Sequence, residues 1–193
     1  MWTVCAVRPM TISELDGALT LDIHDSFPRL EESIAALCGQ LVVVDKYGKV
    51  KMVHETAREF LVAGGLESEF SIEKTKAHTR MAQVCFNYLV GEEMNLPRNS
   101  RRRSSVNLTA TRLDLAAYAC TAYSYHLPRA DPLASGTFQL VMQFLRSNVL
   151  TWIETIADSR NLNNLIRTSK HLKTYANACA AERSPLNPQI QAL

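Results

Sequence analysis

Residues 41–63 read LVVVDKYGKVKMVHETAREFLVA, a pattern that predicts two short strands, a tight turn and a helix. The first run, residues 41–44, is apolar and rich in β-branched side chains, and residues 49–53 alternate polar with apolar. Between them, residues 45–48 are Asp, Lys, Tyr and Gly, which supply turn chemistry. We therefore expect a β-hairpin here.

The helix after this hairpin is expected to begin at His54, with Thr56 and Glu59 at the spacing of a capping box. Its apolar side is expected to consist of Ala57, Phe60 and Leu61. Free N–H groups and the positive dipole end make a helix start favourable for phosphate, and an imidazole can add a donor. Composition alone favours the simpler alternative, in which His54 packs or caps at a strand end.

Three helices are predicted before the hairpin. Residues 2–7 resemble the last turns of a helix, so we expect this chain to be a fragment of a longer protein. Thr11 and Glu14 predict a capping box for the second helix, and the third is expected to start near Pro28 and to end at Gly39. The third helix should bury one side, formed by Leu30, Ile34 and Leu37. Three helices and a hairpin are the order of a winged helix, a variant of the helix-turn-helix.

DNA recognition is the obvious alternative function for that shape, because the third helix would enter the major groove. That helix carries Arg29 but also Glu31 and Glu32, whereas attraction to phosphates needs several net positive charges. The formal net charge of the chain is +2, and the cations are spread out except for the three arginines 101–103. We expect neither nucleic acid nor membrane as a partner.

A second module is predicted to follow Gly64 and Gly65, which gives a winged-helix domain at 1–66 and an α-helical domain at 67–193. The helical domain is expected to open with a long helix and to continue, after a mobile loop at about 91–112, as an α-helical array. The apolar periodicity places the helices near residues 72–90, 115–125, 138–145, 149–156 and 162–172. Residues from 184 onward are expected to be extended. The predicted fold class is therefore mainly α, a winged helix followed by an α-helical array.

Two further features of the helical domain allow both a functional and a structural interpretation. The sequence RRRSS places Ser104 and Ser105 after arginines, a pattern that basophilic kinases accept, although a solvated basic loop is the simpler interpretation. His78 lies off the apolar stripe of its helix, so we expect a structural or solvated role and no ligand nearby.

Catalytic and metal-binding motifs are missing from the 193 residues. There is no Walker A sequence and no GxSxG elbow, and Arg58 stands where a zinc motif starting at His54 needs its second histidine. The five histidines are scattered, and the five cysteines form no C-x-x-C pair, so reduced core thiols are expected. With no signal peptide or bilayer-spanning apolar run, we expect a cytoplasmic protein that is not an enzyme by itself, with no metal and no cofactor of its own.

Six motifs along the chain resemble, in order, the region that follows the nucleotide-binding domain in fungal NACHT-type STAND NTPases. They are AVRPMTISEL, LCGQLVVVD, VKMVHETAREFL, AHTRMAQVCFNYL, LAAYACTAYSYHL and FLRSNVLTWIETIA. The resemblance runs from Cys5 to about Tyr175. The family consists of large NOD-like proteins, often ending in ankyrin or WD repeats, and includes vegetative-incompatibility proteins. The winged-helix part is similar to a domain named after a GPI inositol-deacylase, although no residue here supports that activity.

The resemblance implies that an upstream NACHT domain binds ATP or GTP and that this winged helix closes over it in the resting state. His54 lies where related proteins carry the histidine of a Met-His-Asp motif, which touches the terminal phosphate of a bound nucleoside diphosphate. Here the neighbours are Val53 and Glu55, so it is open whether Glu55 keeps the role of the Asp. The implied function is a regulatory scaffold that couples nucleotide state to homo-oligomerisation, with a winged-helix DNA-binding module or a structural spacer between NTPase and repeats as alternatives.

Overall fold

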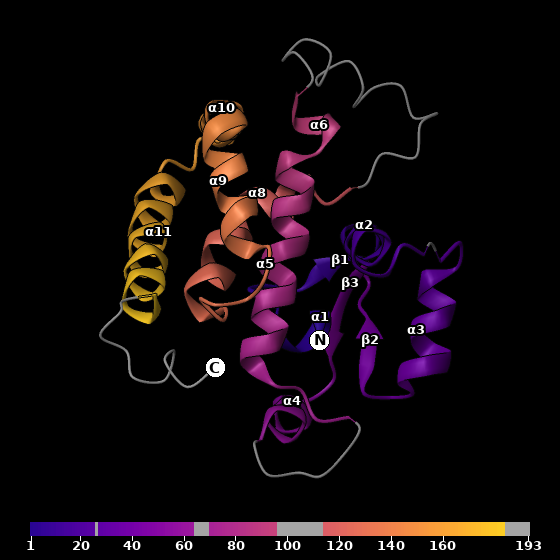
Figure 1. The fold of residues 1–193 in the computed structure, drawn as a ribbon. Helices are drawn as coiled ribbons and strands as arrows, with labels where there is room; N and C mark the ends of the chain where they lie inside the picture. The colour runs from indigo at the N-terminus through magenta and orange to yellow at the C-terminus, as the bar shows by residue number, and fades with distance from the viewer. Residues whose placement is uncertain (26, 64–69, 96–113, 184–193) are drawn as a thin grey trace.

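A computed structural model of the chain describes residues 1–25, 27–63, 70–95 and 114–183. Within these ranges the fold is mainly α-helical, with one small sheet in the N-terminal part (Figure 1). The predicted fold class is confirmed, because a winged helix is followed by an array of helices. Gly64, Gly65 and the boundary predicted at residue 66 lie outside the described residues.

The predicted hairpin is confirmed as β2 and β3. Asp45 closes its turn, because Oδ1 accepts hydrogen bonds from the amides of Tyr47 and Lys49 at 2.9 and 3.1 Å. Gly48 has a φ of +67°, a conformation that favours glycine. The elements of the N-terminal part are α1 (Trp2–Cys5), β1 (Met10–Thr11), α2 (Ile12–Ile23), α3 (Leu30–Cys38), β2 (Val42–Val44), β3 (Lys49–Met52) and α4 (Glu55–Val62).

Strand β1 adds a third member to the sheet, which the sequence did not predict. The order is β1-β3-β2, and both pairs are antiparallel, with Met10 opposite Val50 and Val42 opposite Met52. A strand of two residues is too short to show an alternating pattern. Met10, Val42 and Val50 are buried, so the central strand β3 anchors the hairpin to the core.

The start of α2 confirms the capping box predicted at Thr11 and Glu14. The Glu14 amide donates to Thr11 Oγ1 at 3.1 Å, and the Thr11 amide donates to Glu14 Oε2 at 3.0 Å. Glu14 is only 4% exposed, and Arg8 binds both of its carboxylate oxygens at 2.6 and 2.8 Å. Burial alone would raise the pKa of Glu14, but the bonds from Arg8 and Thr11 outweigh it and hold the pKa below its usual value.

Helix α3 differs from the prediction at its last turn. Leu30 and Ile34 are buried as expected, but Leu37 is 80% exposed, so its predicted place in the core is wrong. The helix packs on β2 and α2, and the described residues do not cover its C-terminal end. Gly39 ends the helix at a φ of +55°, as predicted.

Helix α4 begins at Glu55 after His54, so its predicted start is confirmed and the predicted capping box at Thr56 and Glu59 is wrong. Thr56 already lies within the first turn, where its side chain cannot act as an N-cap. The helix has no buried residue, and Phe60, expected on its apolar side, is 58% exposed.

The C-terminal part confirms the five predicted helices, with α5 starting two residues later than expected. Figure 1 shows α5 running through the middle of the molecule, between the sheet and the remaining helices. Its closest packing partners are α8 and α9. The elements are α5 (Lys74–Val90), α6 (Glu92–Asn95), α8 (Ala116–His126), the 3-10 turn η1 (Leu127–Arg129), α9 (Thr137–Ser147), α10 (Val149–Asp158) and α11 (Asn163–Glu182).

Aromatic rings form the centre of this array. Phe86 of α5, Tyr123 of α8, Phe144 of α9 and Trp152 of α10 meet edge to face, with ring centroids 5.1–6.0 Å apart. Trp152 also donates its indole N–H to the carbonyl of Cys120 at 2.8 Å. Four helices are thereby tied together at one place.

The loop predicted at residues 91–112 begins with a helix, because α6 covers Glu92–Asn95. Met94 of that helix is buried, which explains why a short segment without clear periodicity is ordered. The rest of the predicted loop and the tail from residue 184 lie outside the described residues.

Several polar contacts join the two parts of the fold. Asp22 of α2 accepts hydrogen bonds from Arg80 of α5 and, at 3.1 Å, from the indole of the buried Trp2. The amide of Val7 donates to the hydroxyl of Tyr118 in α8 at 3.3 Å. The winged helix is therefore docked on the array through α1, α2 and the segment between α1 and β1.

No helix within the described ranges combines the length and the apolar composition that a bilayer crossing requires.

Candidate functional site

His54 immediately precedes α4, as the sequence predicted. Its backbone is extended, with φ −132° and ψ 141°, and its carbonyl accepts a hydrogen bond from the amide of Arg58 at 3.4 Å. The imidazole is exposed and makes no capping hydrogen bond. The first amides of a helix have no acceptor within the helix. An exposed ring and unsatisfied donors therefore share one helix start, an arrangement that favours an anion.

Glu55 is the first residue of α4, and its carboxylate is bound by a cation. Its Oε1 lies 3.3 Å from Arg58 Nη1, and Arg58 Nε donates to the carbonyl of Val4 at 2.6 Å. Within the described residues no hydrogen bond or ion pair joins Glu55 to His54. The structure therefore ties Glu55 to Arg58 and α1, and leaves the imidazole next to it unengaged.

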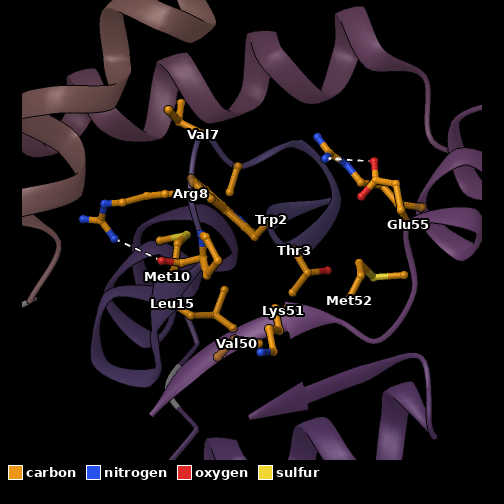
Figure 2. A pocket seen from close by; sticks show the side chains of 13 residues that line it. Trp2, Thr3, Val7, Arg8, Met10, Leu15, Val50, Lys51, Met52 and Glu55 are labelled. Atoms are coloured by element: carbon orange, nitrogen blue, oxygen red, sulfur yellow. Dashed lines mark hydrogen bonds and ion pairs between the residues drawn. The ribbon is translucent and has the colours of Figure 1, made fainter. Parts of the chain in front are cut away.

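A small cavity lies between α1, β3 and the start of α4. Figure 2 shows Glu55 on one side of it and Arg8 on the other, with Trp2, Leu15 and Val50 around the floor. Its volume is about 200 Å³. This is below the range of roughly 300–1,000 Å³ that is usual for small-molecule sites. The cavity by itself is too small to enclose a nucleotide.

The exposed face of α3 bears on the DNA-binding alternative. Arg29 Nη1 pairs with Glu32 Oε2 at 3.4 Å, and Glu31 is exposed beside them. The cation of this helix is thus neutralised by its own neighbour, and the remaining charge is negative. Such a face repels the phosphates of a duplex.

A buried polar chain runs through the array and was missed at the sequence level. Nδ1 of His78 in α5 lies 2.9 Å from Nδ1 of His126 in α8, and Nε2 of His126 lies 2.9 Å from the hydroxyl of Tyr118. His78 is therefore a buried, structural histidine, one of the two roles that the sequence indicated, but its pairing with His126 was not predicted. Tyr118, Ala122 and His126 follow each other at four-residue steps on α8, and this spacing could have indicated that His126 is buried.

Burial governs the protonation of this chain. It lowers the pKa of His78 to about 4, with Arg129 and Lys74 contributing, and that of His126 to about 3, with His78 and Arg129 contributing. Both imidazoles are therefore neutral near pH 7.

The remaining candidate groups are the cysteines, the potential metal ligands and the two candidate phosphorylation sites. All five cysteines are free thiols, as predicted. Cys38 is exposed, and the buried ones are Cys5, Cys85, Cys120 and Cys179. No group of three or more potential metal ligands occurs in the described part of the chain. Ser104 and Ser105 lie outside the described residues, so their phosphorylation remains a prediction.

Comparison with known proteins gives a family match for the N-terminal part of the chain. Residues 1–73 match the family model described as "GPI inositol-deacylase, winged helix domain". No curated protein matches, and no solved structure matches. The match covers the three-stranded sheet and helices α1 to α4, and it indicates a winged-helix domain of the kind that follows NACHT domains.

Proposed function

We propose that this chain is the regulatory, non-catalytic segment of a fungal NACHT-type STAND NTPase. In this proposal the winged helix closes over a NACHT domain that holds ATP or GTP, and His54 contacts the terminal phosphate of the bound nucleoside diphosphate. The observation that carries the proposal is the exposed imidazole at the start of α4, within a domain of the NACHT-associated kind. Free amides and an imidazole N–H are donors that suit a phosphate oxygen.

The switch follows from differential binding. A diphosphate that contacts His54 stabilises the closed arrangement, and a triphosphate that does not fit the same contact favours an open one. The open arrangement would expose surfaces for homo-oligomerisation and for signalling in vegetative incompatibility or programmed cell death. The NACHT domain and C-terminal ankyrin or WD repeats of the longer protein are the proposed partners, and the cytoplasm is the proposed location.

Glu55 has a different role in this scheme from the acid of a Met-His-Asp motif. Its carboxylate pairs with Arg58, which donates to the carbonyl of Val4. We assign to Glu55 the positioning of α4 against α1, and therefore of His54, rather than contact with nucleotide.

The test replaces His54 with Ala in the longer protein. Losing one hydrogen bond to a charged phosphate should speed diphosphate release by about tenfold or more and should promote oligomerisation. Release is measured with a fluorescent nucleotide and assembly by size-exclusion chromatography. His24→Asn is the matched control, because His24 is another exposed histidine and Asn tolerates its φ of +56°.

Two outcomes distinguish the alternatives. Unchanged diphosphate release in His54→Ala, together with a lowered melting temperature, would identify a structural spacer. Salt-sensitive retardation of duplex DNA by the wild-type chain would identify a DNA-binding module.

A further inference from the structure

A larger cavity lies where the winged helix meets the array. Its volume is about 640 Å³, within the usual range of roughly 300–1,000 Å³ for small-molecule sites. Helices α1 and α4 form one side, and the first turn of α5, the end of α8 and η1 form the other. His54 is not part of its wall. The charged and polar residues that line it are Glu55, Arg58, Glu59, Lys74, Thr75, His78, Tyr125 and Arg129.

Two cations on the array side have no carboxylate partner among the described residues. Lys74 is the first residue of α5 and is exposed, and it takes part in no ion pair in the described part of the chain. Arg129 stacks on the ring of Tyr125, 3.8 Å from its centroid, and Nη1 donates to the Tyr125 carbonyl at 2.8 Å. Its guanidinium is therefore held in place with further N–H groups left to donate.

The buried hydrogen-bond chain fixes which nitrogen of His78 carries a proton. The hydroxyl oxygen of Tyr118 accepts from the Val7 amide, and its proton has no acceptor among the described residues other than His126 Nε2. His126 is neutral, so its proton is on Nδ1 and is donated to Nδ1 of His78. His78 is neutral as well and must carry its own proton on Nε2.

Nε2–H of His78 is consequently a donor without a described partner. The residue is only 7% exposed and lines the cavity, while Nδ1 on the other side of the ring is taken by His126. The charges that act most on this imidazole are those of Arg129 and Lys74, both cationic. The array side of the cavity thus presents two cations and one fixed neutral donor, which together suit an oxyanion.

The winged-helix side of the cavity has the opposite character. Glu55 is paired with Arg58, but Glu59 is exposed and unpaired among the described residues. Its carboxylate is an acceptor for hydroxyl or amino groups.

We propose that this cavity binds a small phosphorylated molecule that carries hydroxyl or amino groups. The phosphate contacts Lys74, Arg129 and Nε2–H of His78, and the opposite end of the ligand donates to Glu59. Because the two walls belong to the winged helix and the array, the bound ligand holds α4 against α5. This site is separate from the nucleotide contact assigned to His54, and each proposal can fail without the other.

The binding test uses the 193-residue chain and NMR titration with inorganic phosphate, glucose 6-phosphate and glucose at constant ionic strength. We expect saturable shifts with both phosphates, tighter binding of glucose 6-phosphate than of inorganic phosphate, and none with glucose. Lys74→Gln and Arg129→Gln should each weaken binding about tenfold, which corresponds to about 1.4 kcal/mol.

The matched controls are Lys170→Gln and Arg146→Gln, which remove exposed cations of α11 and α9 away from the cavity. They should bind as the wild type does. Non-saturable shifts, or equal weakening in the cavity variants and the controls, would overturn the proposal. Lys74→Gln breaks no hydrogen bond or ion pair of the described residues and should fold normally, so its result is decisive.

A second measurement is specific for His78. In the free chain, imidazole ¹⁵N spectra should show the proton of His78 on Nε2 and that of His126 on Nδ1. Saturation with glucose 6-phosphate should shift the Nε2 signal of His78 and raise its pKa above about 4, because an anion favours the protonated ring. An unchanged His78 signal at saturation would place the ligand elsewhere and refute the site.

Discussion

Helices α4 and α5 are held in place in different ways. Nine of the 17 residues of α5 are buried, whereas none of the eight residues of α4 is. α5 is positioned by a close-packed core, whereas α4 is positioned by the partial burial of Leu61 and Val62 against that core and by polar contacts such as the 2.6 Å bond from Arg58 to the carbonyl of Val4. An element with few buried residues opens at a lower free energy than one in a close-packed core. We therefore expect α4 to detach from the fold more easily than α5.

The strongest test of this comparison is the same substitution, Phe to Ala, made once in the array and once in α4. Phe144→Ala removes a fully buried ring from the aromatic centre and should lower the free energy of unfolding by about 3–5 kcal/mol. Phe60→Ala removes an exposed ring from α4 and should change it by less than about 0.5 kcal/mol. Urea unfolding monitored by circular dichroism measures both. Equal losses of unfolding free energy in the two variants would contradict the contrast between the array and α4.

Acid should destabilise the array through its buried histidines. In the unfolded chain both imidazoles have a pKa near 6.5, whereas burial lowers it to about 4 for His78 and about 3 for His126 in the fold. Below pH 6.5 the unfolded chain therefore binds protons that the folded chain does not. The contribution of the two histidines to the free energy of unfolding should be fully present above pH 6.5. It should fall by about 1.4 kcal/mol per pH unit for each histidine as the pH decreases to about 4.

The measurement is urea unfolding between pH 7 and 5. His78→Gln removes one of these buried imidazoles and should make the slope clearly shallower. A wild-type slope no steeper than that of His78→Gln would show that the buried chain does not govern the acid response.

Within the winged helix, a buried ion pair should contribute more to the stability of the chain than an exposed one. Glu14→Gln weakens the two bonds from Arg8 and the capping box and should destabilise the chain by about 1–2 kcal/mol. Glu32→Gln breaks the exposed pair with Arg29 and should have an effect below about 0.5 kcal/mol. Thermal melting of both variants tests this prediction. A larger drop in melting temperature for Glu32→Gln than for Glu14→Gln would contradict it.

The smallest expected effect concerns the start of α4 and is a gain. His54 makes no capping bond, and His54→Asp supplies a carboxylate suited to that position, so stability should rise by about 0.5–1 kcal/mol. Thr11→Ala at the start of α2 should lower it by about 1 kcal/mol. A stabilising His54→Asp would indicate that the histidine is kept for a reason other than folding. No gain in melting temperature would remove that argument.

Local patterns predicted the elements well, because turn residues, capping spacing and apolar periodicity act within a few positions. The hairpin around Gly48, the capping box at Thr11 and the helical stripes could be found in this way. The errors arose where contacts between segments distant in the sequence determine the structure. Strand β1 exists through pairing with β3, and Leu37 is exposed because no described segment covers it.

The candidate site also contains one feature that a local pattern predicts and others that depend on long-range contacts. The place of His54 at a helix start follows from the hairpin pattern alone. The pairing of His78 with His126 joins positions 48 residues apart, and one sequence without a known topology does not reveal such a contact. The cavity between α4 and α5 likewise exists only once both parts of the fold are docked.

The uneven exposure of the thiols has a practical consequence. Since Cys38 is the exposed one and the other four are buried, a maleimide fluorophore should attach to the native sequence at that position. The dye would sit at the end of α3, in the winged helix, close to Trp2, which lines the same pocket as Cys38. With Trp2 replaced by Phe, Trp152 inside the array is the remaining tryptophan and could serve as an energy-transfer donor. Relative movement of the two parts on ligand binding would then be visible as a change in transfer efficiency.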